Sequence, residues 1–423
     1  MTATAPVRFN PFGADFRRDP YPQYRALREA DPVHRTLGMW VLTRHADVTT
    51  VLRDRTYGAG LIPQLVERQA QRLHGRADVT AEGVARIARL ARTSLVFTDD
   101  PDHARLRGLV NRVFTAAAVA ELRPRVDAIV EDLLHPVAGE VTDAVADLAA
   151  PLPVRVLSDW MALPPDLAAR VGSWTHDIRF LLEPGLMGPD ELARACEVVE
   201  TFGDALGGIV AERRRAPGED LLSRLTAAGT AAGDRLGDEE VVFVGIMCFV
   251  AGTETTTALV ANGLLALLGH PEQAELLHRR PELARGAVGE VLRYDGPLQL
   301  TKRLATRDLD IDGRSVTAGD QILLCLGAAN RDSAVFHAPN DFDITRDPRR
   351  HLAFGHGMHG CLGGALAELQ AEVALARLVG GPLCPRLAAD DVTWQDRSMI
   401  VRGPTAVPVR WGSTPRRSRR RGP

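Results

Sequence analysis

Cysteine is scarce in this sequence, and the few that occur follow no pattern. The 423 residues include an odd number of irregularly spaced cysteines, which are Cys196, Cys248, Cys325, Cys361 and Cys384. A small secreted fold held by disulfides uses an even, regularly spaced set, so this composition excludes a disulfide framework. It fits a reducing compartment. We therefore expect a cytoplasmic protein in which each cysteine needs its own explanation.

Net charge and targeting signals are also lacking. The 51 Lys and Arg residues nearly balance the 54 Asp and Glu residues, and the formal net charge is −3. Such a chain has no general attraction toward nucleic acid or anionic lipid. The first twenty residues contain no apolar stretch long enough for the core of a signal peptide. We therefore expect no secretion, no nucleic-acid partner and a small molecule as the ligand.

No apolar run is long enough to cross a membrane without interruption. The longest, Val241 to Gly252, is followed by the polar segment Thr253 to Thr257 before apolar residues resume at Ala258 to Leu268. A membrane span needs about 20 apolar residues without a central charge. The pattern therefore predicts a long helix through the core of the protein, with a polar defect midway and no membrane attachment.

The remaining composition is that of one large globular unit, with 45% hydrophobic and 25% charged residues and neither repeats nor linkers. Amphipathic helix patterns dominate, and short β signals occur between them. The sequence predicts a mainly α fold with small peripheral sheets, as a single domain over 19–412 between an N-terminal extension (1–18) and a disordered basic tail (413–423). The predicted helices include Tyr24–Ala30, Pro124–Leu134 and Gly364–Leu378, and the predicted strands lie in Gly38–Thr43, Leu309–Val316 and Val407–Trp411.

One cysteine lies in a glycine-rich loop that leads directly into a helix pattern. The loop runs from Phe354 to Gly363 and presents Cys361 among Gly355, Gly357, Gly360, Gly363 and Gly364. Glycine allows positive φ angles and lets the backbone approach a flat ligand closely. The amides at a helix start stabilise an anion, which favours a thiolate at Cys361. The loop therefore indicates a metal ligand.

The loop also allows three other interpretations. The spacing of Gly355, Gly357 and Gly360 matches a dinucleotide fingerprint, but no buried strand precedes it and no acidic residue follows at the required distance. His356, His359 and Cys361 could bind zinc, but a fourth ligand and the spacing of a structural site are missing. An inert cysteine in a turn is the third alternative, which the dense glycines disfavour.

The Phe354–Gly363 segment resembles the haem-binding loop of the cytochrome P450 family, in its soluble bacterial, actinomycete-like form. The resemblance implies the cytochrome P450 fold and a haem b whose iron is bound by the Cys361 thiolate. It places Phe354, Gly355 and Gly363 beside the haem, with Phe354 shielding the sulfur. His359 resembles the residue that contacts a haem propionate.

Other motifs support the resemblance. Glu290 and Arg293 share one helical face and look like the family's Glu-x-x-Arg motif, which belongs to a buried network that supports the haem loop. His103 and Arg107 follow Pro101 at a predicted helix start, and Arg303 precedes a β segment. Buried propionates require cationic partners, so we expect His103, Arg107, Arg303 and His359 to meet them.

The polar defect in the long helix, Ala251 to Thr255, resembles the oxygen-activating segment of the family. Ala251 is expected beside the haem. Threonine hydroxyls can bond back to helix carbonyls and loosen the helix. The resemblance implies that Glu254 and Thr255 deliver protons during oxygen activation.

These features predict a haem-thiolate monooxygenase that inserts one oxygen atom from O2 into a hydrophobic small molecule, by hydroxylation or epoxidation. A polyketide or aromatic secondary metabolite is the expected substrate class. The pocket is predicted from four apolar residues, Leu298, Leu300, Met399 and Ile400, with Tyr57–Thr93 and Ser173–Leu186. A peroxide-dependent or nitric-oxide-reducing relative and a non-catalytic haem-binding sensor remain the alternatives.

The chain has no room for a fused flavin reductase, so we expect a separate ferredoxin and ferredoxin reductase. Arg105 and Arg112 are predicted on one helix, opposite His103 and Arg107, where they could meet an acidic ferredoxin. A solvated helix face is the equally simple alternative.

Overall fold

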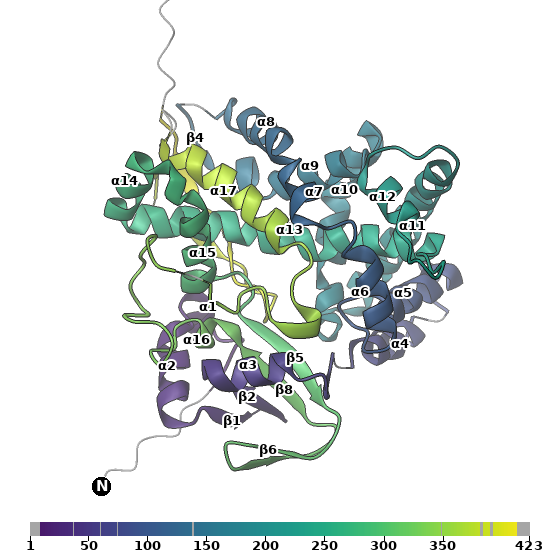
Figure 1. Ribbon diagram of the computed structural model, residues 1–423, viewed down its shortest axis with the longest axis horizontal. Helices are drawn as coiled ribbons and strands as arrows, with labels where there is room; N and C mark the ends of the chain where they lie inside the picture. Colours follow the sequence, from purple (N-terminus) through teal and green to yellow (C-terminus); the bar gives the residue numbers. More distant parts are fainter. Residues whose placement is uncertain are drawn as a thin grey trace, which may run out of the picture.

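The molecule is built mainly from helices, with one larger sheet beside them (Figure 1). The computed structural model describes residues 9–412 except positions 37, 60, 74, 138, 348, 381–383, 390 and 391. The α-helices are α1 (Ala14–Arg18), α2 (Tyr21–Ala30), α3 (His45–Arg53), α4 (Ile62–Gln71), α5 (Ala81–Thr93), α6 (Asp102–Val110), α7 (Ala116–Ala120), α8 (Arg123–Leu134), α9 (Pro151–Trp160), α10 (Pro165–Ile178), α11 (Pro189–Arg215), α12 (Leu221–Ala227), α13 (Asp238–Gly269), α14 (Pro271–Arg279), α15 (Ala284–Asp295), α16 (Leu326–Ala329) and α17 (Gly364–Gly380). Short 3-10 or π segments are η1 (Val145–Ala149), η2 (Arg179–Leu182), η3 (Pro184–Leu186), η4 (Pro281–Leu283) and η5 (Gly357–His359).

The strands form one five-stranded sheet and three small ones. The larger sheet has the order β1-β2-β8-β5-β3; β2 and β8 run parallel, and the other neighbours are antiparallel. The small sheets are β10-β11, β4-β12-β9 and the hairpin β6-β7. The strands are β1 (Val33–Thr36), β2 (Met39–Leu42), β3 (Tyr57–Gly58), β4 (Val141–Asp143), β5 (Leu300–Ala305), β6 (Leu309–Ile311), β7 (Arg314–Val316), β8 (Gln321–Cys325), β9 (Arg386–Leu387), β10 (Thr393–Trp394), β11 (Pro404–Ala406) and β12 (Pro408–Arg410).

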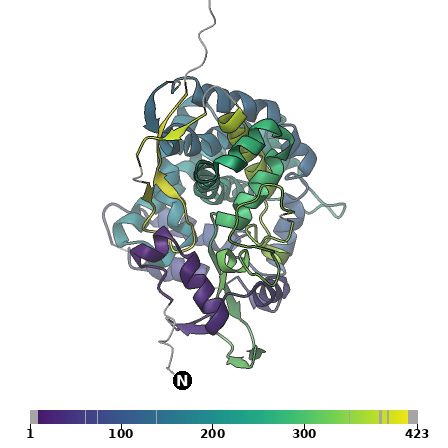
Figure 2. The same cartoon turned by 90° about the vertical axis from the view of Figure 1, so that its left-hand side faces the viewer.

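Helix α13 passes through the centre of the molecule and is seen end-on in Figure 2. It is apolar on nearly every face and packs against α9, α11, α15 and α17. Full burial of each large apolar side chain contributes about 1.5–3 kcal/mol. Within the described part of the chain, α13 is the one helix long and apolar enough to cross a membrane. Its packing among four neighbouring helices is instead that of the predicted core helix.

The contact between α13 and α17 is close because one helix contributes a glycine. A Cβ atom placed on Gly263 would lie 2.7 Å from Cδ1 of Leu375 on α17. Any side chain at position 263 would therefore push the two helices apart. This close packing joins the C-terminal halves of α13 and α17, and so fixes α17, which follows the loop that carries Cys361, relative to α13.

The predicted elements are present, with ends within three residues of those expected. The predicted helices correspond to α2, α8, α13 and α17, and the predicted strands to β2, the β6-β7 hairpin and β12. Arg303 precedes the β6-β7 hairpin, as predicted, but it also lies inside β5, a strand that the sequence did not predict. Arg112 was expected on the helix of His103, but α6 ends at Val110.

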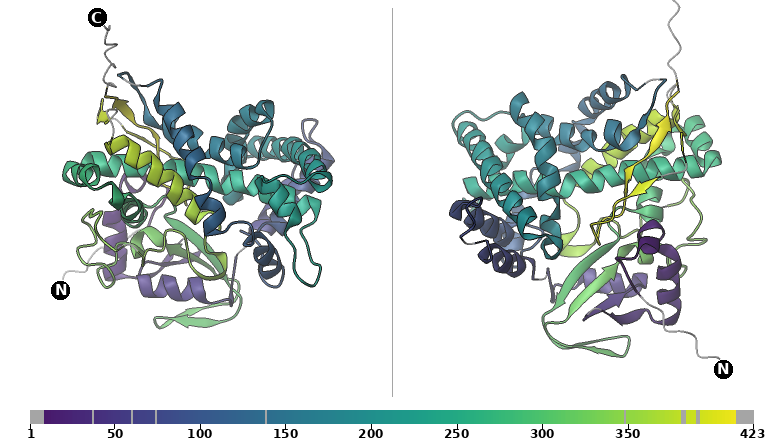
Figure 3. Two further views of the ribbon diagram at one scale, coloured as in Figure 1. Left: turned by 45° about the horizontal axis from the view of Figure 1, so that its top comes forward. Right: turned by 180° about the vertical axis from the view of Figure 1, so that it is seen from behind.

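The predicted boundary at residue 18 remains a prediction, although part of the predicted extension packs closely onto the fold. The ring of Phe16 contacts those of Phe9 and Tyr24 edge-to-face, and all three are buried. Arg402 donates to the carbonyl oxygens of Arg17 and Arg18 at 2.7 and 3.0 Å. The N-terminal segment is thereby tied to the C-terminal strands, which run along the molecule in the rear view of Figure 3. The predicted basic tail, 413–423, lies outside the described residues.

Candidate active site

A cavity of about 720 Å³ lies between the middle of α13, the start of α17 and strand β5. Its wall is mostly apolar, and it includes the four residues predicted for a substrate pocket: Leu298, Leu300, Met399 and Ile400. Segments of the two predicted pocket regions also contribute, from α4 and the end of α5 and from η2 and η3. A mostly apolar space of this size is typical of a small-molecule site.

The loop Phe354–Gly363, here called the cysteine loop, forms one wall of the cavity. The Cys361 amide donates to the Phe354 carbonyl at 2.8 Å, which closes the loop on itself. Gly357 has φ +72°, and a Cβ atom there would lie 2.4 Å from the Leu52 carbonyl oxygen. The phenyl ring of Phe354 packs on Gly364, where a Cβ atom would lie 3.3 Å from Cδ2 of the ring. The glycines at 357 and 364 therefore set the shape of the loop.

Cys361 is exposed, but to the cavity, whose wall it helps to form. Burial away from bulk water raises the pKa of its thiol, and the amides of Gly363 and Gly364 and the Arg107 charge offset only part of that rise. The amides at the helix start thus lower the pKa of the thiol, as expected from the sequence, but burial outweighs them. A cationic metal would be needed to displace the proton.

Four cationic or potentially cationic residues, here called the cationic wall, lie at the cavity or directly behind it: His103, Arg107, Arg303 and His359. Burial lowers the pKa of Arg107 and of Arg303. Among the described residues, the Arg107 guanidinium donates to no acceptor, and Arg303 donates only to the carbonyl of its neighbour Lys302 at 2.7 Å.

The two histidines of the cationic wall stack on each other, with ring centroids 4.4 Å apart. His359 lines the cavity, whereas His103 lies behind it, and burial lowers the pKa of His103 to about 4. The buried Nε2 atoms of both lack a hydrogen bond, although Asp99 Oδ1 lies 3.5 Å from Nε2 of His359. So many buried donors without acceptors fit an anionic ligand group, such as the propionates of a haem.

The polar defect of α13 faces the cavity only in part. The Thr253 and Thr255 hydroxyls donate back to the carbonyls of Phe249 and Ala251 at 2.8 and 2.7 Å. Ala251, Gly252 and Thr255 line the cavity, as does Thr256, which the sequence analysis did not single out. This stretch therefore opens the helix surface toward the cavity without interrupting the helix.

Glu254 is not among the cavity-lining residues. Burial raises its pKa to about 7, against the opposing charge of Arg179 and with a smaller contribution from Glu183. At neutral pH its carboxyl is therefore close to half protonated. It could exchange protons with the cavity only through water or a change of side-chain rotamer.

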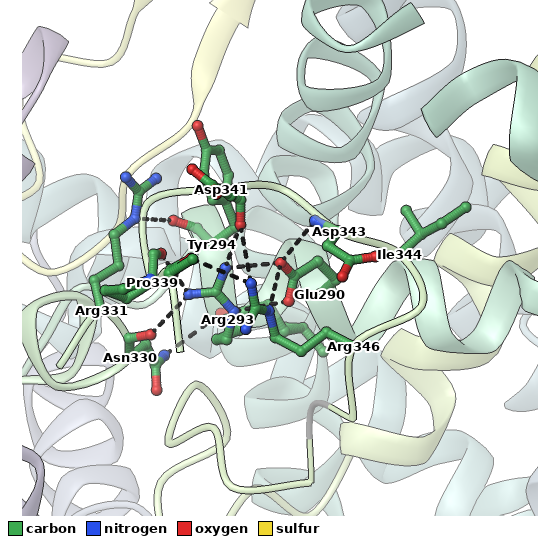
Figure 4. Close-up of polar contacts among 12 residues, drawn as sticks. Glu290, Arg293, Tyr294, Asn330, Arg331, Pro339, Asp341, Asp343, Ile344 and Arg346 are labelled. Carbon is green, nitrogen blue, oxygen red and sulfur yellow. Dashed lines mark hydrogen bonds and ion pairs between the residues drawn. The ribbon is translucent and has the colours of Figure 1, made fainter. Parts of the chain in front are cut away.

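The predicted pair Glu290–Arg293 is the centre of a fully buried polar cluster (Figure 4). Both side chains are 0% exposed, and two hydrogen bonds of 2.7 Å join them. Arg293 also donates to the carbonyls of Asn330, Pro339 and Asp341 at 2.8–3.1 Å. Glu290 accepts from the Asp343 amide at 3.0 Å and from Nε of Arg346 at 3.2 Å.

This cluster reaches the cysteine loop through Asn330, a residue that the sequence analysis missed. Asn330 accepts the Leu352 amide at 2.7 Å on its side-chain oxygen, and the Leu352 carbonyl accepts the Gly355 amide at 2.8 Å. The link depends on a loop more than thirty residues from Arg293 in sequence, so local spacing could not reveal it. The geometry makes the cluster a support for the start of the loop.

The predicted ferredoxin contact Arg105 is already engaged. Its guanidinium forms ion pairs with Asp234 at 3.0 Å and with Glu240, at the start of α13, at 2.7 Å. Arg112 is exposed beyond the end of α6. The two arginines therefore do not form the single free helix face that the sequence predicted.

A helical fold around one central helix, with a cysteine presented at a helix start to a cavity bordered by Arg107, Arg303 and His359, defines a class of protein suited to an anionic, metal-bearing cofactor. Comparison with known proteins identifies the family. A family model described as Cytochrome P450 matches residues 186–380. The chain is 36% identical to the cytochrome P450 monooxygenase PikC of Streptomyces venezuelae, over 100% of this chain and 98% of PikC. It is 34% identical to 6-deoxyerythronolide B hydroxylase of Saccharopolyspora erythraea, over 93% and 96%.

Solved structures agree. The crystal structure of CalO2 matches with a TM-score of 0.87 and 35% identity, over 96% of this chain and 99% of that one. The chain therefore belongs to the cytochrome P450 family. It is a monooxygenase and thus an oxidoreductase, and the family implies a haem-iron cofactor, O2 and a small-molecule substrate.

Proposed function

We propose that this monooxygenase holds haem b with the Cys361 sulfur as the ligand of the iron. The observation that carries the proposal is the position of that sulfur, which is on the cavity wall, at the amides of Gly363 and Gly364, and in reach of the Arg107 charge. Arg107, Arg303 and His359 would hold the propionates, with His103 supporting His359. Ala251, Phe354, Gly355 and Gly363 would border the porphyrin.

The bound haem supplies the activation of O2, and the protein positions the substrate and provides protons. Thr255 lines the cavity and can turn its hydroxyl from the Ala251 carbonyl toward a cavity acceptor. Glu254, with its pKa near 7, can supply protons at neutral pH. We therefore assign proton delivery to Glu254 and Thr255.

The substrate is proposed to be a hydrophobic small molecule that is hydroxylated or epoxidised. The apolar wall at Leu298, Leu300, Met399 and Ile400 supports this. The relatives include 6-deoxyerythronolide B hydroxylase and the polyketide biosynthesis protein PksS. A polyketide or aromatic secondary metabolite is accordingly the substrate class we propose.

A separate ferredoxin and ferredoxin reductase are proposed as electron donors. Of the two arginines first considered for docking, only Arg112 is exposed and outside the ion pairs at the start of α13. We also propose a cytoplasmic location, which fits five free cysteines, and a single domain over 19–412.

A carbon-monoxide difference spectrum of the reduced protein tests the ligand. Wild type should show the band that marks thiolate ligation, and Cys361→Ser should lose it. Cys384→Ser, at an exposed cysteine outside the cavity wall, should keep it. A spectrum typical of histidine-ligated haem in wild type, or an unaltered band in Cys361→Ser, would contradict the assignment.

Proton delivery is tested by Glu254→Gln and Thr255→Ala. Positioned acid–base groups typically contribute about 10²- to 10⁴-fold, so product formed per electron pair should fall sharply while haem content stays unchanged. Thr253→Ala is the matched control, because its hydroxyl is bonded to Phe249 and the residue does not line the cavity. Equal coupling in all three variants would refute the assignment.

A further inference from the structure

The chain contains a single lysine, and that lysine lies in the cavity wall. Of the 51 Lys and Arg residues, only Lys302 is lysine. It belongs to β5 and is among the cavity-lining residues. An ammonium group is strongly hydrated and usually lies on the surface. All the other Lys and Arg positions hold arginine, and the one lysine borders an apolar cavity.

The Lys302 ammonium has no hydrogen-bond or ion-pair partner among the described residues. An ammonium carries three donors and no acceptor, and leaving it partly buried without acceptors costs free energy. Burial accordingly lowers the pKa of Lys302. A ligand oxygen in the cavity would satisfy donors that the protein leaves unmet.

Glu183 balances the charge of Lys302 without taking its hydrogen bonds. The Glu183 carboxylate accepts the Met399 amide at 2.9 Å on one oxygen and the Ser398 hydroxyl on the other. It acts on Lys302 through charge alone and forms no ion pair with it. Because the Glu183 charge offsets that of Lys302, the ligand need not carry a charge. A neutral oxygen acceptor suits the site as well as an anionic one.

Lys302 is also separate from the cationic wall. Lys302 and Arg303 both border the cavity, but as neighbours on β5 their side chains leave the strand on opposite faces. The charge that acts on Arg303 is Asp99, whereas the charge that acts on Lys302 is Glu183. The propionate contacts proposed above therefore leave Lys302 unaccounted for.

We propose that Lys302 is a specificity-determining residue that donates a hydrogen bond to an oxygen acceptor, a carbonyl or a carboxylate, on an otherwise apolar substrate. This inference rests on the proposed haem-thiolate function, because it names the substrate class of the same cavity. The bound substrate would then have an oxygen atom that faces Lys302 on β5.

Imidazole-tethered chains test this in the haem-loaded enzyme. The imidazole nitrogen binds the iron and shifts the haem absorption, so binding is registered whatever the other end carries. Chains of graded length end in a methyl ketone, a carboxylate or, as the isosteric control, an isopropyl group. At the length that reaches Lys302, we expect an oxygen-terminated chain to bind about tenfold more tightly than its isopropyl counterpart, as a charge-assisted hydrogen bond allows.

Variants locate the donor. Lys302→Met keeps the length of the side chain and should abolish the preference, whereas Thr301→Val removes a neighbouring cavity hydroxyl and should keep it. A ketone preference without a carboxylate preference assigns a neutral substrate oxygen, and the reverse assigns an anionic one. Equal ratios in wild type and Lys302→Met at every length would overturn the inference. Failure of every chain to shift the haem absorption would instead overturn the proposed function.

A second measurement needs no substitution. Reductive methylation with ¹³C-formaldehyde labels only Lys302 and the N-terminal amine, because the chain has no other lysine. We expect one of the two dimethylamine NMR signals to move when an oxygen-terminated chain binds and to move much less with the isopropyl-terminated chain. Identical responses to both chains would contradict a direct contact with Lys302.

Discussion

The Glu290–Arg293 cluster and the cationic wall both bury guanidinium groups, but they treat the donors of those groups in opposite ways. Arg293 donates to Glu290 and to three carbonyl oxygens. Arg107 donates to no described residue, and Arg303 only to its neighbour's carbonyl. A satisfied buried charge stabilises the fold, and an unsatisfied one destabilises it until a ligand arrives. The first region therefore supports the fold, whereas the second, which we propose as part of the cofactor site, lowers the stability of the fold until a ligand binds.

The largest expected effect on stability comes from removing the hydrogen bonds of the Glu290–Arg293 cluster. Arg293→Met leaves the buried Glu290 carboxylate without its partner, which should lower the free energy of unfolding by about 3–5 kcal/mol. Arg349→Met, in an exposed ion pair with Asp347, is the control and should leave the free energy of unfolding almost unchanged, because solvent screens that pair. Urea denaturation followed by circular dichroism measures both. If the two variants lose similar amounts of unfolding free energy, the Glu290–Arg293 cluster does not stabilise the fold more than an exposed ion pair does.

A smaller effect is expected within the cysteine loop, which joins the two regions. Gly357→Ala places a Cβ atom at a positive φ and against the Leu52 carbonyl oxygen, and should cost about 1–3 kcal/mol. Gly363→Ala meets no atom within 4 Å and should leave the haem-free protein nearly as stable. Its added methyl group should instead weaken haem binding. Unfolding of the haem-depleted proteins and haem titration separate the two outcomes.

Burial raises the pKa of the Glu254 carboxyl to about 7. Because the folded pKa exceeds the ordinary value of 4.5, protonated Glu254 stabilises the folded state. That contribution is complete below about pH 4.5 and is lost as pH rises through 7. Glu254→Gln should therefore exceed the stability of wild type by about 1 kcal/mol at pH 5 and by about 3 kcal/mol at pH 8.

Glu131→Gln, at an exposed position, is the control for this pH dependence. Its difference from wild type should be the same at pH 5 and pH 8. Denaturation curves for the three proteins at both pH values provide the measurement. A Glu254→Gln difference that does not grow with pH would show that Glu254 is not destabilised by burial.

The smallest change in stability is expected in the cationic wall itself. Arg107→Met removes a cation that burial already disfavours, so the free energy of unfolding of the haem-depleted protein should change by no more than about 0.5 kcal/mol. Haem transfer to apomyoglobin should nevertheless speed up about tenfold, since a charged hydrogen bond is lost. Strong destabilisation without faster haem loss would make Arg107 a structural residue like Arg293.

Features encoded locally could be predicted from sequence. The apolar run of α13, the start of α17 and the spacing of Glu290 and Arg293 each lie within one element, and the structure contains all of them. Likewise, the apolar residues predicted for the pocket do line the cavity. Local pattern thus located the elements that build the site.

Features that depend on distant contacts could not be predicted. Arg105 was expected to be free because Asp234 and Glu240 are more than 120 residues away in sequence. The pKa of Cys361 was expected to fall because the amides of the helix start are local, whereas its burial depends on the whole cavity. Lys302 did leave a signal, since its uniqueness is visible in the composition, but only the structure shows that it borders the cavity.

The wall of the cavity draws on residues as far apart as Phe12 and Ile400, with β5 and the cysteine loop between them. A chain still emerging from the ribosome therefore has no cofactor pocket, even after α13 has been made. The proposed haem can therefore bind only after nearly the whole chain has been made, and a shortage of haem should leave full-length chains without cofactor.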